Sequence, residues 1–313
     1  MGKIKRKNRK SLIIISILIL LIILVTLLTI FVNNNYQQTL SLNKKLTTEL
    51  NELKNTHQEK DQTNKELTTK LNNLTNITEN TNNLKQEVFT LTAKLEQKII
   101  KKESKAKIAY LTFDDGPYYL TNKYLDILKK YQVKGTFFTI GLDKDNCFDN
   151  KNKDCSNIYK KIVDDGHTIA NHTYSHLIFN GLYSSTNSFI NQVKKQQNLI
   201  KKRTGVTTNI VRFPGGSGTA QAYGIKDDAI KQLRKLGYGW VDWDAMDGDG
   251  GAISSKSEAL KIFKKSINDN IEVVLLHDYS QITLAILPDI IEYLQDKNYI
   301  LLPLFYESIK VNK

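Results

Sequence analysis

Leu111-Thr112-Phe113-Asp114-Asp115-Gly116-Pro117 is the stretch that best indicates how this chain folds. An apolar run from Ile108 to Phe113 leads directly into two adjacent carboxylates and a Gly-Pro turn. Neighbouring side chains on a strand point to opposite faces, but a turn at the strand's end can bring both carboxylates into one cleft. Two acids that close repel each other unless a cation or a base gives them different roles. The pattern favours one Asp as a metal ligand and the other as a base, and a strand that ends in an ordinary polar turn is the simpler alternative.

Composition divides the chain into two parts. Neither Gly nor Pro occurs between Lys3 and Asp115, whereas all four Pro and fifteen of the sixteen Gly lie at or after Gly116. Of the net charge of +13, residues 1–105 contribute +9 (18 Lys and Arg against 9 Asp and Glu) and residues 106–313 only +4 (27 against 23). We therefore expect an elongated helical front and a compact, turn-rich back. A nucleic-acid-binding domain concentrates positive charge on its own surface, so this distribution argues against nucleic acid as a partner.

The first 32 residues have the pattern of a membrane anchor. A basic leader, residues 1–11, precedes Leu12–Val32, whose 21 residues would form a helix of about 31 Å and match a hydrocarbon core of roughly 30 Å. A secretory signal peptide has a shorter apolar region and a small-residue cleavage site, which residues 33–36 do not provide. The basic leader predicts a single-pass protein of the cell membrane, with its N-terminus in the cytoplasm and everything after Val32 outside.

Residues 33–105 are expected to form a stalk. Leucines at spacings of three and four, with a slip near Ile77, follow the seam of a coiled coil. Several seam positions are polar, so a helix here would form a homo-oligomer only weakly. A disordered polar tether is the alternative. In either form the segment is a spacer.

Residues 106–313 alternate between short apolar runs and helix-like stretches. The expected strands are 107–113, 135–140, 168–171, 209–213, 238–243, 272–276 and 299–304, and the expected helices lie near 122–131, 157–165, 184–203, 225–236, 256–268 and 282–295. Strand–helix alternation predicts a parallel sheet. Seven strands predict an α/β fold of the distorted (β/α)7-type barrel class, in which chemistry lies at the carboxyl ends of the strands.

Two histidines directly follow the strand expected at 168–171. His172 and His176 are four residues apart, which on a helical turn places both imidazoles on one face, within reach of one metal ion. Two solvated histidines are the simpler interpretation of this spacing alone. With Asp115 the pair makes an Asp-His-His set that leaves a position open for water and substrate, as in catalytic zinc sites. We assign His57 to the stalk and His167 to a loop, without a functional role.

Two further strand ends carry groups suited to catalysis. Arg212 can hold Asp114 ionised and aimed as a base. Gly215 lets the backbone approach closely, so its N–H could donate to a developing oxyanion. His277 ends an apolar run and suits a general acid whose pKa is set by a neighbouring carboxylate.

The stretch from Asp242 to Asp249 contains four acids in eight residues. One of them could orient a histidine, and Trp243 could form a wall of the cleft. We expect most of the remaining acids to lie in a solvated loop.

Taken in order, these blocks resemble the five motifs of the polysaccharide deacetylases, the NodB-homology domain of carbohydrate esterase family 4. The resemblance covers about residues 105–305, through the blocks Thr112–Pro117, His172–His176, Arg212–Gly215, the acidic loop near Trp243, and Leu275–His277. The layout of the whole chain is similar to that of membrane-anchored peptidoglycan N-acetylglucosamine deacetylases.

The resemblance implies a role for each residue. Asp114 would be the catalytic base, Arg212 its tether, Gly215 the oxyanion donor and His277 the acid, while Asp115, His172 and His176 would hold a divalent metal, zinc in preference to cobalt or another ion. Trp243 and Leu275 would contribute to the substrate cleft. The chain departs from the family where Asp249 precedes Gly250 in place of Trp, and where Gly215 replaces a common aromatic residue. Asp249 is the first choice for the carboxylate that orients His277, and Asp244 the second.

The implied reaction is metal-dependent hydrolysis of N-acetyl groups from N-acetylglucosamine residues of a cell-surface polysaccharide. Peptidoglycan is favoured because an anchor and a spacer would place the site within a cell wall, and a secreted poly-glucosamine chain, which would be equally within reach, is the alternative polymer. An O-acetyl polysaccharide esterase of the same family would use the same mechanism, and a catalytically silent wall-binding domain is the alternative from a different class.

Cys147 and Cys155 lie in a hydrophilic segment that looks like an insertion. Outside the membrane a disulfide is permitted, and it would contribute about 2–3 kcal/mol by closing a short loop. Two free surface thiols are the alternative.

Overall fold

The structure, a computed structural model, describes residues 81–141 and 156–313. The basic leader, the apolar stretch 12–32, residues 33–80 of the expected stalk and both cysteines lie outside the described residues. The chain divides into two units between Leu91 and Thr92. Of the first unit only Thr81–Leu91 is described, as the beginning of helix α4 (Thr81–Ile100). None of the helices within 81–141 and 156–313 has the length and apolar character that a membrane span requires.

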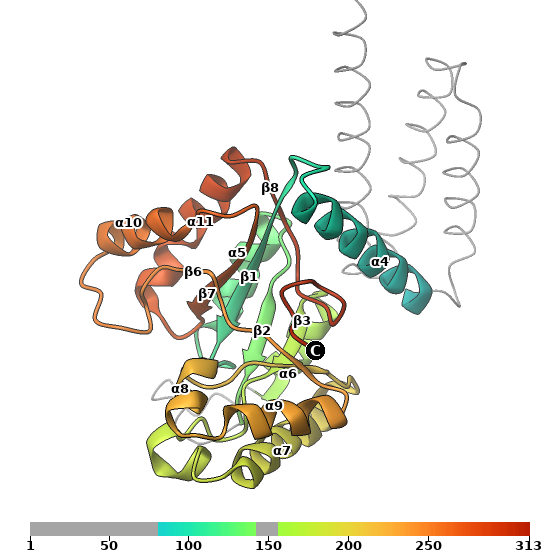
Figure 1. Cartoon of the computed structure of the whole chain (residues 1–313). Helices are drawn as coiled ribbons and strands as arrows, with labels where there is room; N and C mark the ends of the chain where they lie inside the picture. The colour runs from blue at the N-terminus through green and yellow to red at the C-terminus, as the bar shows by residue number, and fades with distance from the viewer. Residues whose placement is uncertain (1–80, 142–155) are drawn as a thin grey trace, which may run out of the picture. The chain divides into compact units, whose positions relative to one another are not determined.

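Residues Thr92–Lys313 are built around one sheet of eight strands (Figure 1). The strands are β1 (Lys107–Asp114), β2 (Thr136–Thr139), β3 (Thr168–Asn171), β4 (Ile210–Val211), β5 (Gly239–Trp240), β6 (Ala245–Met246), β7 (Ile271–His277) and β8 (Tyr299–Leu301). Their order is β5-β4-β3-β2-β1-β7-β6, with β8 paired to β1, and the pairings between these strands are parallel. No ladder within the described residues joins β5 to β6, so the sheet is a curled half-barrel of the α/β class.

Strand β1 is the centre of the sheet. It pairs along its length with β7, from Ile108 opposite Ile271 to Asp114 opposite His277. Its first three residues also pair with β8 and its last three with β2. All of β7, and all of β1 after its first residue, are buried, as expected for a parallel strand covered on both faces. The register therefore places Asp114 and His277 side by side at the carboxyl end of the sheet.

Helices enclose two hydrophobic clusters. The helices are α5 (Thr121–Lys130), α6 (Ser156–Asp164), α7 (Thr186–Thr204), α8 (Ser217–Ala222), α9 (Lys226–Lys235), α10 (Lys256–Ser266) and α11 (Gln281–Asp296), with a π-helical turn at Ile178–Leu182. The larger cluster joins the centre of the sheet to α5, α10 and α11. The smaller one lies among α7, α8, α9 and β4, where Phe189 stacks on Phe213 at a centroid distance of 4.7 Å.

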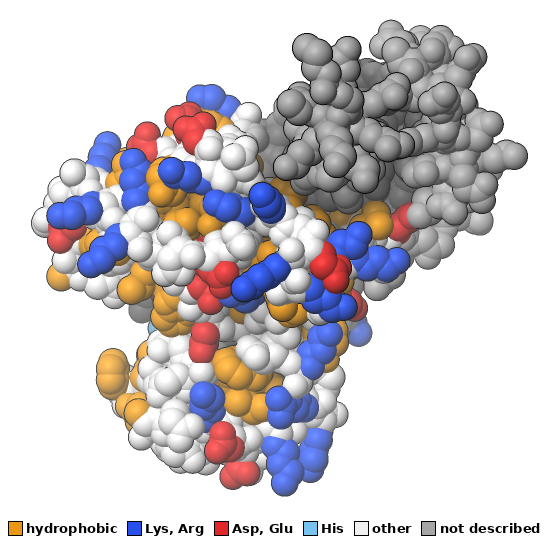
Figure 2. Space-filling view, turned by 45° about the horizontal axis from the view of Figure 1, so that its top comes forward, with side chains coloured by type: hydrophobic (Ala, Val, Ile, Leu, Met, Phe, Trp, Pro, Cys, Tyr) orange, Lys and Arg blue, Asp and Glu red, His pale blue; other side chains and the backbone are white. Residues whose placement is uncertain are grey.

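The surface carries charges of both signs. On the face drawn in Figure 2, Lys and Arg side chains are interspersed with Asp, Glu and apolar side chains over the described residues. The positive charges on this face are thus spread out and do not gather over one element.

The expected seven strands are all present, but the structure has an eighth. Ala245–Met246 forms β6 by pairing with Val274 and Leu275 of β7. The apolar runs expected at 209–213 and 238–243 form strands of only two residues each, because the chain leaves the sheet after Val211 and Trp240. Helix α8 was also not expected from the sequence.

Candidate metal centre and active site

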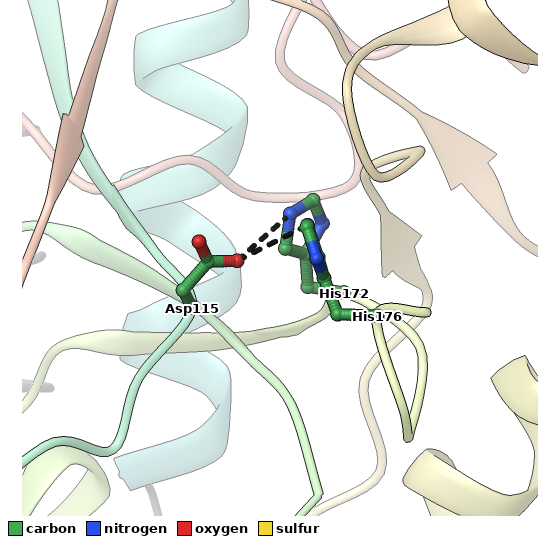
Figure 3. Close-up of side chains that lie close together, drawn as sticks. All are labelled: Asp115, His172 and His176. Carbon is green, nitrogen blue, oxygen red and sulfur yellow. Dashed lines mark ion pairs between the residues drawn. The ribbon is translucent and has the colours of Figure 1, made fainter. Parts of the chain in front are cut away.

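Three side chains from two loops converge at the carboxyl end of the sheet (Figure 3). Asp115 directly follows β1, and His172 directly follows β3. Asp115 Oδ1 lies 3.5 Å from His172 Nε2 and 3.3 Å from His176 Nε2. Within residues 81–141 and 156–313 this is the one group of at least three potential metal-ligating side chains, and its donor atoms all lie within 4.8 Å of one another. The structure therefore brings together the predicted Asp-His-His set.

The backbone holds these ligands in uncommon conformations. Asp115, Thr173 and His176 have φ angles of 72°, 68° and 54°, in the left-handed region that costs energy for residues other than glycine. The loop between the histidines is fixed by Asn171, whose side-chain oxygen accepts from the Thr173 N–H at 2.9 Å. Thus His172 and His176 meet through a strained loop and not through the helical turn expected from their spacing.

The buried histidine is prepared as a ligand. His172 Nδ1–H donates to the carbonyl oxygen of Arg212 at 2.9 Å, which leaves the lone pair of Nε2 facing Asp115. Burial, and then the charge of His176, lower the pKa of His172 to about 3. A neutral imidazole is the form that binds metals.

The donor set fits a divalent metal ion. Asp115 Oδ1 is buried and has no hydrogen-bond partner, although it faces two imidazole nitrogens. A buried carboxylate oxygen without a partner is costly unless a cation satisfies it. One carboxylate and two imidazoles are ligands typical of catalytic zinc sites, which keep a further position open.

Asp114 lies next to this cluster and is held by Arg212. The carboxylate is 2% exposed, and its Oδ1 accepts from Arg212 Nη1 at 2.8 Å. Arg212 is fully buried and also donates to Thr112 Oγ1 and to the carbonyls of Val241 and Asp242. Burial raises the pKa of Asp114, while the charges of Arg212 and His277 oppose that rise. Arg212 thus aims a carboxylate whose proton affinity is above the usual range, which suits a base.

His277 faces the cluster from the neighbouring strand. Its Nδ1–H donates to Asp249 Oδ1 at 2.6 Å, and its backbone N–H donates to Asp249 Oδ2 at 2.8 Å. Its Nε2 lies 3.9 Å from Asp115 Oδ2. Burial alone would lower the pKa of His277, but the hydrogen bond and the charge of Asp249 raise it to about 9. A raised pKa favours the protonated Nε2 that a general acid requires.

Gly215 follows Arg212 by three residues in the chain, and Trp243 lies near the Arg212 guanidinium. Gly215 has a φ of 70°, and a Cβ there would lie 2.9 Å from Thr219 Oγ1, so the position favours glycine. The Arg212 guanidinium lies near two aromatic rings, 4.1 Å from the centroid of Phe138 and 5.8 Å from that of Trp243. Trp243 thus packs on the residue that holds the base. Leu275 is buried in β7, two residues before His277 and so on the same face of the strand.

The acids from Asp242 to Asp249 were expected to be mostly solvated. Asp244 is exposed and Asp242 half-buried, but Asp247 and Asp249 are buried, contrary to this expectation. Asp242 accepts from the N–H and hydroxyl of Ser217, at 2.9 and 2.6 Å. Asp244, the second choice for orienting His277, instead accepts from the Val273 N–H and pairs with Lys310. Asp247 is fully buried. Each acid in this loop has a structural partner, and Asp249 is the one that reaches His277.

Two functional-site neighbours were not identified from the sequence. Asp278 is fully buried beside Gly116, and its Oδ2 accepts from the Thr121 hydroxyl at 2.5 Å. Thr283, in the first turn of α11, contacts both Asp247 and Asp249. The position of Asp278 directly after His277 could have indicated that it lies near the site. Thr283 lies inside a helical run, and nothing in the sequence marks it as a neighbour of the site. His167 is buried as well, and its Nδ1 accepts from the Gly135 N–H, a structural role.

Comparisons with known proteins identify the family of this chain. A sequence profile described as polysaccharide deacetylase matches residues 101–241. A Bacillus cereus protein named peptidoglycan-N-acetylglucosamine deacetylase is 30% identical over 198 residues, which cover 62% of this chain and 67% of that protein.

Solved structures give the same result. The catalytic domain of a peptidoglycan N-acetylglucosamine deacetylase from Eubacterium rectale is similar with a TM-score of 0.59 and 32% identity, covering 66% of this chain and 92% of that one. A Streptococcus mutans CE4 esterase is similar with a TM-score of 0.55 and 30% identity, covering 68% and 91%. Because sequence, fold and site agree, this chain belongs to the polysaccharide deacetylase family and is a hydrolytic enzyme that deacetylates a polysaccharide.

Proposed function

We propose that this enzyme removes N-acetyl groups from N-acetylglucosamine residues of peptidoglycan. The observation that carries the proposal is the pair Asp114 and His277, which lie opposite each other on β1 and β7 and both face the Asp115-His172-His176 cluster. Hydrolysis of an amide requires a base for the attacking water and an acid for the departing amine. The two groups have the positions and the proton affinities that these roles need.

Asp115, His172 and His176 would hold the metal ion, for which we propose zinc. When bound, such an ion polarises a carbonyl and lowers the pKa of water, which is the chemistry that acyl hydrolysis uses. Calcium and magnesium prefer sites made of oxygen ligands, so the two imidazoles favour a transition metal.

Asp114 is proposed to take the proton from the attacking water. Its Oδ1 is bound to Arg212, so Oδ2, which lies 3.5 Å from His172 Nε2, is the oxygen that faces the cluster. Arg212 fixes the carboxylate in one orientation through several buried hydrogen bonds. This rigidity keeps the base in place during the reaction.

His277 is proposed to give its Nε2 proton to the departing amine nitrogen, while Asp249 holds the resulting imidazole. The Gly215 N–H is proposed to donate to the oxyanion that forms on the acetyl carbonyl. A backbone N–H in a fixed turn is a suitable donor because it needs no reorganisation as the charge develops.

An aromatic strip beside His277 supports a sugar as the substrate. The ring of Tyr279 lies 5.0 Å from that of His277, Tyr118 packs 6.2 Å from Tyr279, and Tyr119 lies 4.6 Å from Tyr118. These partly exposed rings give an apolar surface next to the acid, as ligand sites often do. The names of the Bacillus cereus and Eubacterium rectale relatives favour peptidoglycan among the polysaccharides.

We also propose that the enzyme acts outside the cell, held to the membrane by residues 12–32 and separated from it by the stalk. The basic leader and the apolar stretch support this placement, as does a substrate that lies in the cell wall.

The test compares three substrates on the zinc-loaded enzyme. We expect acetate release from N-acetylated chito-oligosaccharide and from peptidoglycan glycan strands, and little from O-acetylated xylan. Mass spectrometry of wall fragments from cells with and without the protein should show fragments that lack an acetyl group. Acetate release from xylan alone would show an O-acetyl esterase, and release from none of them would show a silent wall-binding domain.

A further inference from the structure

A single hydroxyl group lies between two buried carboxylates behind His277. Thr283 Oγ1 is 2.7 Å from Asp247 Oδ2 and 2.7 Å from Asp249 Oδ2. Its third neighbour, Ser280 Oγ, is 2.9 Å away. Thr283 and Asp247 are fully buried and Asp249 is 8% exposed, so water does not screen the two acids from each other. The chain His277–Asp249–Thr283–Asp247 therefore extends the pair at the active site by two residues.

Counting protons shows that one of these acids is neutral. A hydroxyl has one proton and can donate to only one of the two carboxylates. Two ionised carboxylates around it would leave the other oxygen 2.7 Å from a lone pair, which is repulsive. Both short contacts are hydrogen bonds only if one acid carries a proton and donates it to Thr283 Oγ1.

The remaining contacts decide which acid this is. Both oxygens of Asp249 accept from His277, Oδ1 from the ring N–H and Oδ2 from the backbone N–H. Asp247 accepts one N–H, that of Asp249, on Oδ1 at 3.1 Å. Its Oδ2 meets the Thr283 hydroxyl and accepts no N–H in the hydrogen bonds of the described residues. Donors stabilise the ionised form of a carboxylate, so the proton resides on Asp247 Oδ2.

We propose that Asp247 is a positioning residue for the general acid: its proton is donated to Thr283, Thr283 donates to Asp249, and Asp249 is thereby kept ionised and fixed against His277. This inference rests on the proposed function, in which His277 protonates the departing amine. With three donors Asp249 has one orientation, and so has the imidazole that it binds. An ionised Asp247 would compete for the Thr283 proton and place a second negative charge behind Asp249.

The surroundings of Asp247 agree with a neutral acid. Burial, and then the charge of Asp249, raise the pKa of Asp247. The neighbouring titratable groups are Asp249 on its own loop, His277 on β7 and Tyr124 on α5. Burial, and then the charges of Asp278 and Asp249, raise the pKa of Tyr124, so its phenol stays neutral and supplies no negative charge.

The test uses two substrates with different needs for an acid. The amine of an N-acetyl sugar must be protonated as the C–N bond breaks, whereas 4-nitrophenolate leaves 4-nitrophenyl acetate without a proton. The ester therefore reports on the metal site and Asp114, and the amide reports in addition on His277. Acetate release from N-acetylated chito-oligosaccharide by the wild-type zinc-loaded full chain is measured first, because this result alone tests the proposed function.

Two matched pairs of variants then test the hydrogen-bond chain from Asp247 through Thr283 and Asp249 to His277. Thr283→Val and Asp247→Ala remove a link, whereas Thr283→Ser and Asp247→Asn keep a hydrogen-bond donor at the same place. We expect kcat for the amide to fall at least about tenfold in the first two, with KM nearly unchanged and ester hydrolysis lowered less than about threefold. We expect Thr283→Ser and Asp247→Asn to lose less than about threefold in amide kcat, because Asn reproduces the donor of a protonated Asp.

Two outcomes of the kinetics would overturn the proposal. Equal losses in Asp247→Asn and Asp247→Ala would show that an ionised Asp247 is needed. A parallel fall of amide and ester rates would show that the residues serve only the packing of the site.

An infrared spectrum tests the proton without any substrate. At neutral pH, the difference between wild-type and Asp247→Asn spectra should contain the carbonyl band of a protonated carboxyl group. A carboxylate band in its place would contradict the assignment, even if Thr283→Val or Asp247→Ala failed to fold.

Discussion

Asp114 is the residue on which the proposed reaction depends most directly. In Asp114→Asn the side chain keeps its size and can still accept from Arg212, but it can no longer take a proton. We expect kcat for N-acetylated chito-oligosaccharide to fall at least about a hundredfold, the lower end of the contribution of a general base. Acetate release measures this loss.

The metal content of the same variant is the control. Asp115, His172 and His176 are unchanged in Asp114→Asn, so zinc should remain bound at one equivalent, measured by atomic emission. Nearly normal acetate release by zinc-loaded Asp114→Asn would refute the role of Asp114 as the base.

Gly116, which follows Asp114 and Asp115, packs closely against Asp278, which follows His277. A Cβ at this position would lie only 2.1 Å from Asp278 Oδ2, and Asp278 is fully buried and bound to Thr121. We expect Gly116→Ala to lower the free energy of unfolding by about 1–3 kcal/mol, because the buried carboxylate must move. Urea unfolding followed by tryptophan fluorescence measures the change.

A second glycine provides the matched control. A Cβ on Gly218, in helix α8, would meet no atom within 4 Å. Gly218→Ala should therefore leave stability unchanged or raise it by up to about 1 kcal/mol, the difference in helix propensity. Equal stability of Gly116→Ala and Gly218→Ala would contradict the packing of Asp278 described above.

At the scale of elements, a buried acid joins the end of α4 to the sheet. Glu96 is fully buried; its Oε1 accepts from the Tyr110 hydroxyl of β1 at 2.7 Å, and its Oε2 accepts from the Ile309 N–H at 3.1 Å. Burial raises the pKa of Glu96 to about 7, although both hydrogen bonds oppose the rise. One carboxyl group thus links a helix, a strand and the C-terminal segment.

This raised pKa makes stability depend on pH. The folded state binds the Glu96 proton more tightly than the unfolded state, whose pKa is the ordinary 4.5. The contribution of Glu96 to the free energy of unfolding is therefore greatest below pH 4.5 and falls as the pH rises to about 7. The loss is at most about 3 kcal/mol.

Glu96→Gln isolates this contribution. Gln has no proton to lose, so between about pH 5 and pH 8 its free energy of unfolding should fall less than that of the wild type. Other buried acids, such as Asp278 and Glu272, contribute equally to both proteins and cancel in the comparison. Parallel pH curves for the two proteins would show that Glu96 does not titrate in this range.

The elements also show why the sequence predicts some of this fold and not the rest. Strands β1 and β7 are long apolar runs, and the periodicity of such runs is visible in a sequence. Strand β6 has two residues and exists because β7 offers a partner edge. A strand that short carries no periodic signal of its own.

The same distinction applies to the site. Asp115 and His172 were predictable because each directly follows a long or buried strand, and strand ends meet at one edge of a parallel sheet. Asp247 and Thr283 come from an irregular loop and a helix, and their meeting depends on how α11 packs against the sheet. Burial, which decides the protonation of Asp247, is a property of the folded chain and is not visible in the sequence.

At the scale of the whole molecule, the proposed function needs the enzyme to be outside the cell and attached to it. The apolar stretch 12–32 can achieve this as an uncleaved anchor or, in the alternative, as a signal peptide that is removed. The two possibilities predict different N-termini and different locations for the mature protein.

We predict an uncleaved anchor with the catalytic domain outside. The full chain should sediment with membranes, resist extraction with alkaline carbonate and retain its N-terminal sequence, because removing 21 largely apolar residues from a bilayer is strongly unfavourable. A protease added to intact cells should release an active fragment, since everything after Val32 faces outward.

Replacing residues 1–32 with a cleavable secretion signal should move the same activity into the medium, which controls for folding of the remainder. A mature protein that begins after Val32 and appears in the medium without this replacement would show that the stretch is a signal peptide. The enzyme would then reach the wall by diffusion, and the proposed role of residues 33–105 as a spacer fixed to the membrane would be lost.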